Sequence, residues 1–136
     1  MPKIENGVNA ATMLGGLENA KKLKLAEIND ACETAMQALT ATYPDTERLT
    51  FDQQKAEALA YQADNNADCP MLRPLAEARG MSMDELCGRV LAKAAAFSAA
   101  VGRLMGERQR MEDALDACDT IADVQAIAVA YSGFGA

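Results

Sequence analysis

Residues 82–118 read SMDELCGRVLAKAAAFSAAVGRLMGERQRMEDALDAC, and this stretch decides the fold. Its apolar residues recur at steps of three, four or seven, which places them on one face of an α-helix with nearly the regularity of a coiled coil. They are Leu86, Val90, Ala94, Phe97, Val101, Leu104, Met111, Leu115 and Cys118, and Arg108 alone interrupts the series. An unbroken helix of this length would be about 55 Å long, longer than a compact domain of this size is wide. We therefore expect either the central helix of a bundle or an arm that reaches a partner.

The apolar face of this helix needs a cover, because an isolated helix of this kind is not stable in water. Small residues repeat every four positions at Ala94, Ser98, Gly102 and Gly106. Such a ridge allows another backbone to approach closely, although a bend near Gly106 or plain surface glycine would also explain it. The cover is the first helix, a second subunit or another protein. Our candidate interface comprises Ala94, Phe97, Ser98, Val101, Gly102, Leu104, Gly106, Met111 and Leu115.

The rest of the chain also has the pattern of helices. The composition is rich in alanine and poor in aromatic residues, which favours helix over sheet. We predict an all-α bundle of about five helices, forming a single domain over residues 17–131 between a flexible leader, 1–16, and a flexible tail, 132–136. The predicted helices cover residues 17–42, 51–63, 70–79, 82–118 and 121–131.

Local signals set the boundaries of these helices. Thr50 to Gln53 and Ser82 to Glu85 each have the form of a capping box, and Gly80 supplies a left-handed stop. In the helix over 51–63 we expect Phe51, Ala58 and Leu59 to be buried. In the last helix, capped by Thr120, we expect four residues to face inward: Ile121, Val124, Ile127 and Ala128.

Charge and hydropathy exclude several classes of partner. The net charge of −7 would repel a nucleic-acid backbone, and no basic patch is large enough to reverse that. No uncharged apolar run approaches the roughly 20 residues that a membrane span needs. We expect no nucleic-acid partner, no membrane association and a cytoplasmic location.

The residues that could carry chemistry do not converge. The chain has no histidine and its four cysteines are widely spaced, so we expect no metal and no cofactor. Cys69 lies in a predicted loop and is the most exposed to reagents on this interpretation, but it lacks the usual histidine base. The acidic pair Asp84 and Glu85 consists of neighbours that diverge by about 100° on a helix. We predict that the protein is not an enzyme.

Three stretches resemble a known family. They are residues 17–35, residues 49–58 with 75–81, and residues 108–117, which reads RQRMEDALDA. Together they resemble the small helical proteins encoded beside the tail-fibre genes of tailed bacteriophages and prophages, described as tail-fibre assembly or tail-associated proteins. The likeness covers roughly residues 17–130, and this chain has Phe51 where a tryptophan often stands in the family.

The resemblance implies a non-catalytic protein that binds a tail-fibre or baseplate component, as an assembly chaperone or as a structural adaptor that stays in the phage particle. Two alternatives come from other classes. One is a bacterial helical homodimer with no phage role, and the other is a small helical enzyme.

Overall fold

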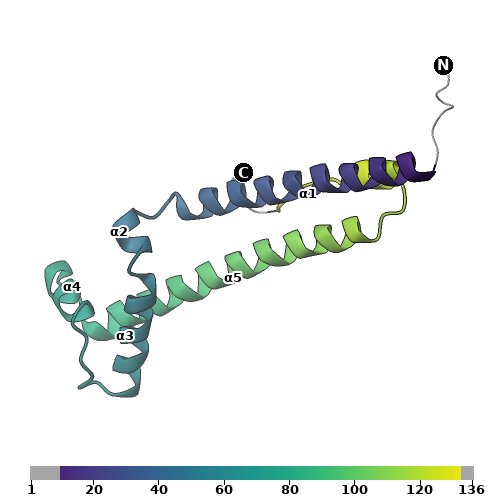
Figure 1. The fold of residues 1–136 in the computed structure, drawn as a ribbon. Coiled ribbons are helices and arrows are strands. Elements are labelled where there is room, and N and C mark those ends of the chain that lie inside the picture. The colour runs from purple at the N-terminus through teal and green to yellow at the C-terminus, as the bar shows by residue number, and fades with distance from the viewer. Residues whose placement is uncertain (1–9, 133–136) are drawn as a thin grey trace. The chain divides into compact units, whose positions relative to one another are not determined.

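The computed structural model describes residues 10–132, with side chains described from residue 15 onward. The described chain is all-α, as predicted, and contains six helices (Figure 1). They are α1 (Ala10–Thr40), α2 (Asp45–Arg48), α3 (Phe51–Ala63), α4 (Leu72–Arg79), α5 (Met83–Asp116) and α6 (Ile121–Gln125). The first nine residues of the predicted leader and the last four of the predicted tail lie outside the described part.

The chain forms two compact units. Among the described residues, unit 1 consists of 10–39 and 103–132, and unit 2 consists of 40–102. Helix α5 contributes its C-terminal half to unit 1 and its N-terminal half to unit 2. Each unit has its own buried core. The domain boundaries proposed from the sequence stay a prediction.

In unit 1, α1 and the C-terminal half of α5 lie side by side (Figure 1). Their core consists of Ile28 from α1, Met111 and Leu115 from α5, and Cys118 and Val124 from the C-terminal segment. Ile28 and Ala35 of α1 are both buried. The long N-terminal helix therefore covers the part of the α5 stripe that lies in this unit.

The segment after α6 lies against α1 rather than continuing as a helix. The Tyr131 hydroxyl donates to the Ile28 carbonyl over 2.8 Å, and Lys24 Nζ donates to the Ile127 carbonyl over 3.2 Å. Our prediction that the last helix continues to residue 131 was wrong, because it ends at Gln125. The cap at Thr120 is confirmed, and so is the burial of Val124. Ile121 is 41% exposed and Ala128 is also exposed, so the inward orientation predicted for them was wrong.

In unit 2, α3, α4 and the N-terminal half of α5 pack around a second core. Its buried residues are Ala58, Cys69, Leu72, Ala76, Leu86 and Cys87. The bounds of α3 are those predicted, and Gly80 ends α4 with a φ of 67°. The amide of Met81 donates to the Ala76 carbonyl over 3.0 Å, which is the six-to-one bond of a Schellman motif. Ser82 caps α5, because its Oγ accepts from the Glu85 amide over 3.1 Å.

Several local predictions were wrong. Helix α1 begins at Ala10 rather than Leu17, and the short helix α2 lies between the predicted helices 17–42 and 51–63, where no helix was predicted. Thr50 makes no side-chain cap to α3, because its hydroxyl donates to the carbonyls of Thr46 and Glu47 instead. Leu59 was expected in the core and is 51% exposed.

The small-residue ridge of α5 has no close neighbour within the described chain. The helix assignment continues through Gly102 and Gly106 without a break. A Cβ added at either glycine would meet no atom within 4 Å among the described residues, and both positions are exposed. No described residue therefore packs closely against these two glycines.

Candidate protein-binding groove

Unit 2 contains an open groove of about 740 Å³ between α2, α3, α4 and α5. Seven of its lining residues are apolar, and these form what we call the floor: Phe51, Met71, Leu75, Leu86, Val90, Ala94 and Phe97. Six are charged, and these form what we call the rim: Glu47, Asp52, Lys55, Arg79, Arg89 and Lys93. Thr46, Thr50, Gln54 and Ser98 complete the lining. An apolar surface with charged edges is typical of a site that binds another molecule.

Three aromatic rings from different segments pack together at the groove. The ring centroids of Tyr43 and Phe51 are 5.2 Å apart, and those of Phe51 and Phe97 are 5.6 Å apart, both in edge-to-face arrangements. The rings of Tyr43 and Phe97 complete the triangle at 6.3 Å. All three side chains remain only half-buried. Aromatic contact area that a fold leaves partly exposed is a common anchor for a partner.

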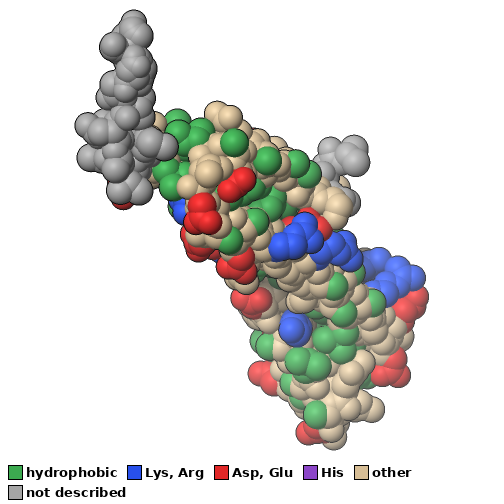
Figure 2. Space-filling view, turned by 90° about the vertical axis from the view of Figure 1, so that its right-hand side faces the viewer, with side chains coloured by type: hydrophobic (Ala, Val, Ile, Leu, Met, Phe, Trp, Pro, Cys, Tyr) green, Lys and Arg blue, Asp and Glu red, His purple; other side chains and the backbone are tan. Residues whose placement is uncertain are grey.

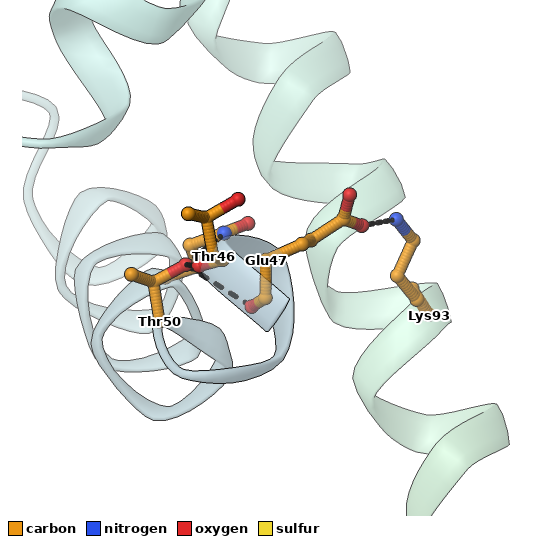
Figure 3. A network of polar contacts seen from close by, with 5 residues as sticks. Thr46, Glu47, Thr50 and Lys93 are labelled. Atoms are coloured by element: carbon orange, nitrogen blue, oxygen red, sulfur yellow. Dashed lines mark hydrogen bonds and ion pairs between the residues drawn. The ribbon is translucent and has the colours of Figure 1, made fainter. Parts of the chain in front are cut away.

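A polar network joins α2 to α5 beside these rings. The carboxylate of Glu47 points toward α5 and forms an ion pair with the ammonium of Lys93 (Figure 3). The same ammonium lies 5.3 Å from the centre of the Tyr43 ring, within range of a cation–π interaction. Thr50 Oγ1 accepts from Gln54 Nε2 over 2.9 Å, in addition to its bonds to the carbonyls of α2. These contacts hold α2 and Tyr43 at one side of the groove.

The cations of the rim differ in how far they are neutralised. Arg89 pairs with Glu85 over 2.9 Å on the exposed surface of α5, and Lys93 pairs with Glu47. Lys55 on α3 and Arg79 at the end of α4 form no ion pair with any described residue. Both are exposed. Two positive charges at the groove are therefore available to a bound molecule.

A buried carboxylate supports the other side of the groove. Glu57, only 7% exposed, accepts through Oε1 from the amides of Met71 over 3.0 Å and Leu72 over 2.9 Å. Its Oε2 accepts from Gln53 Nε2 over 2.9 Å. Helix α4 has no capping side chain of its own, so Glu57 from α3 satisfies its first amides. This role was missed from the sequence, where the absence of Ser, Thr, Asp or Asn at Met71 was the available signal.

The nine candidate interface residues fall into three groups. Ala94, Phe97 and Ser98 line the groove. Leu104, Met111 and Leu115 are at most 6% exposed and are already covered within the chain. Val101 is half-buried, and the two glycines Gly102 and Gly106 are exposed. The sequence thus located part of the groove on α5, but it missed the contributions of α2, α3 and α4.

Three of the four cysteines are buried, Cys32 is half-buried, and none of them lines the groove. Cys69 and Cys87 are fully buried, so the prediction that Cys69 is the most exposed of the four cysteines was wrong. The Cys69 thiol instead donates to the Glu57 carbonyl over 3.5 Å. Burial raises the pKa of the Cys87 thiol, and the neighbouring Cys69 raises it further. Among the described residues, no group of three or more Cys, Asp or Glu side chains could hold a metal ion.

Comparison with known families gives one partial match. The model of a family described as the HI1402 helical domain matches residues 92–129, less than a third of the chain. The matched segment begins in α5, includes Phe97, Met111 and Leu115, and continues past α6. The search of curated proteins gave no match, and the search of solved structures gave none either. No helix in the described part has the length and hydropathy that crossing a membrane requires.

Proposed function

We propose that this chain is a non-catalytic protein-binding module whose partner is a tail-fibre or baseplate component of a phage or prophage. The observation that carries the binding role is the groove of unit 2, which keeps a cluster of half-buried aromatic and aliphatic side chains open at the surface. The tail-associated role is supported by the resemblance of residues 17–35, 49–58 with 75–81, and 108–117 to tail-fibre assembly proteins.

The chemistry of the groove supports binding over catalysis. Its lining contains two carboxylates, Glu47 and Asp52, and Glu47 is engaged by Lys93. The chain has no histidine, and the fully buried thiol of Cys87 has a raised pKa, which disfavours the nucleophilic thiolate. Nothing in this set resembles a nucleophile held beside a base.

Affinity purification of the tagged protein from its own host after prophage induction tests this proposal. Mass spectrometry should find tail-fibre or baseplate proteins with the wild type. Val90→Asp should lose them, because it places a carboxylate in the apolar floor of the groove. Leu23→Asp is the matched control, since Leu23 lies in unit 1 and is 64% exposed. If Val90→Asp and the wild type recover the same partners, the groove is not the binding site.

Self-association is a second candidate with its own observation. Unit 1 exposes Met105 by 46% next to Gly106, where space for a close approach is open. A second copy of the chain could cover this ridge, and the protein would then be a helical homodimer. Recovery of only the protein itself, at a mass above one chain, would favour this role and exclude the tail-associated one.

A further inference from the structure

We infer that the groove of unit 2 binds an amphipathic helical segment whose apolar face is flanked by acidic residues. This inference rests on the proposed function and specifies the chemistry of the partner. It follows from the distribution of charge around the groove, from the pairing of that charge and from the shape of the floor.

The charge of the rim is opposite to that of the whole chain. The chain carries 13 cationic against 20 acidic residues, whereas the groove is lined by four cationic residues, Lys55, Arg79, Arg89 and Lys93, and by two acidic ones. On the face drawn in Figure 2, basic and acidic side chains are interspersed among hydrophobic ones. A local positive excess in an acidic protein favours an acidic partner and disfavours a basic one.

The arrangement of the paired and unpaired cations points the same way. Arg89 and Lys93 lie one helical turn apart on α5 and are held by Glu85 and Glu47. Lys55 and Arg79, on α3 and α4, have no acidic partner in the described chain. An occupant with acidic residues beside its apolar face would neutralise these two.

The floor suits the side chains of a helix. Val90, Ala94 and Phe97 follow each other along α5 at steps of four and three. Met71, just before α4, and Leu75, within it, are four residues apart. Apolar anchors at positions i, i+3, i+4 and i+7 of a partner helix fill a groove of this kind. The occupant we infer is therefore a helix that buries such anchors between the two rows.

Two synthetic peptides of about five helical turns test this inference. Both carry leucine at i, i+3, i+4 and i+7, and they differ only in having glutamate or lysine at the flanking positions. We expect the glutamate peptide to bind at least about tenfold more tightly at low salt, and its affinity to fall as salt is added. Binding of the glutamate peptide should change the amide chemical shifts of Val90 and Phe97.

The double variant Lys55→Glu with Arg79→Glu should lower the affinity for the glutamate peptide by about tenfold or more. The matched control is Lys22→Glu with Arg110→Glu, which changes the net charge equally at exposed positions of unit 1 and should keep the affinity. Circular dichroism confirms that each variant is folded. The milder Lys55→Gln with Arg79→Gln should give an intermediate affinity.

Three outcomes would overturn the inference. The peptides could bind equally well, or the double variant could keep its preference for the glutamate peptide. The third outcome is that palmitate changes the amide chemical shifts of Val90 and Phe97 while neither peptide does. The groove would then be a site for a small apolar anion.

If the double variant still recovers tail proteins from the induced host, only the charge inference fails. If the wild type recovers none, the proposed function fails.

Discussion

In the C-terminal half of α5, Leu104, Met111 and Leu115 are each at most 6% exposed, whereas Val90, Phe97 and Val101 in the N-terminal half remain half-buried. The two halves carry one apolar stripe, which Arg108 alone interrupts. Its C-terminal half is covered by α1, α6 and the segment after α6, whereas its N-terminal half, apart from the buried Leu86, borders an open groove. Helical periodicity thus identifies which residues share a face, and the neighbouring elements determine whether that face is core or binding surface.

The largest expected effect is a difference in stability between substitutions in the two halves of α5. Leu104→Ala should lower the free energy of unfolding by about 2–5 kcal/mol, because it removes a fully buried side chain and leaves a cavity. Val90→Ala should cost about 1 kcal/mol or less, since Val90 is already partly in contact with water. Chemical denaturation measures both. Equal losses of stability would show that the two halves of the stripe are equally buried.

A smaller loss is expected at the carboxylate that supports the groove. Glu57→Ala should cost about 1–3 kcal/mol, because the amides of Met71 and Leu72 lose their acceptor. Glu57→Gln keeps one acceptor oxygen and should cost less. The control is Glu77→Ala on the exposed surface of α4, which should change stability by less than about 0.5 kcal/mol. If Glu57→Ala left the free energy of unfolding unchanged, this carboxylate would not be needed to position α4.

The third prediction concerns the segment that closes unit 1. Burial is the main cause that raises the pKa of Tyr131 from 10.0 to about 12, and the neighbouring Cys32 is the second. A group whose pKa is higher in the folded state than in the unfolded state contributes its full stabilisation at pH values below the unfolded-state pKa. That contribution is lost as the pH rises through the folded-state pKa. Unit 1 should therefore lose stability between pH 10 and about 12.

Tyr131→Phe should abolish this alkaline loss. At neutral pH it should cost about 0.5–1.5 kcal/mol, since it deletes the hydrogen bond to the Ile28 carbonyl. Thermal melts of both proteins across this pH range measure the effect. An alkaline loss of the same size in the variant would assign it to another group.

The smallest effect compares one glycine from each half of α5. Gly88 and Gly106 are both exposed, and a Cβ at either would meet no described atom within 4 Å. Each change to alanine should therefore raise the stability by about 0.5–1 kcal/mol. If a second copy of the chain packs on the ridge in unit 1, Gly106→Ala should also weaken self-association in sedimentation experiments, while Gly88→Ala should not.

Much of the fold could be predicted because local signals set it. Gly80 and Ser82 mark the end of α4 and the start of α5 through backbone conformation and a side-chain cap, which act within a few residues. The apolar spacing of α1 and α5 likewise depends only on helix geometry. Thr50 shows the limit of such signals. Its sequence context predicted a cap on α3, but its hydroxyl donates to the carbonyls of Thr46 and Glu47 in α2.

The groove was only partly predictable, because it is built from contacts between distant segments. Its α5 wall was identified through Ala94, Phe97 and Ser98, which lie on one helix. Nothing in the local sequence distinguishes Glu57 from an exposed acidic residue of α3. Only the packing of α3 against α4 gives it a structural role. Ala58 and Leu59 were both expected in the core, but adjacent residues diverge by about 100° on a helix, and only Ala58 is buried.

Site-specific photo-crosslinking in the induced host is the most direct test that the N-terminal half of α5 borders a binding site. A photoreactive phenylalanine analogue is placed at Phe97 in the groove and, in a separate protein, at the exposed Leu23 of unit 1. We predict a crosslink from position 97 to a tail-fibre or baseplate protein and none from position 23. Crosslinks from position 23 alone, or from position 97 only to a second copy of this chain, would contradict the proposed function.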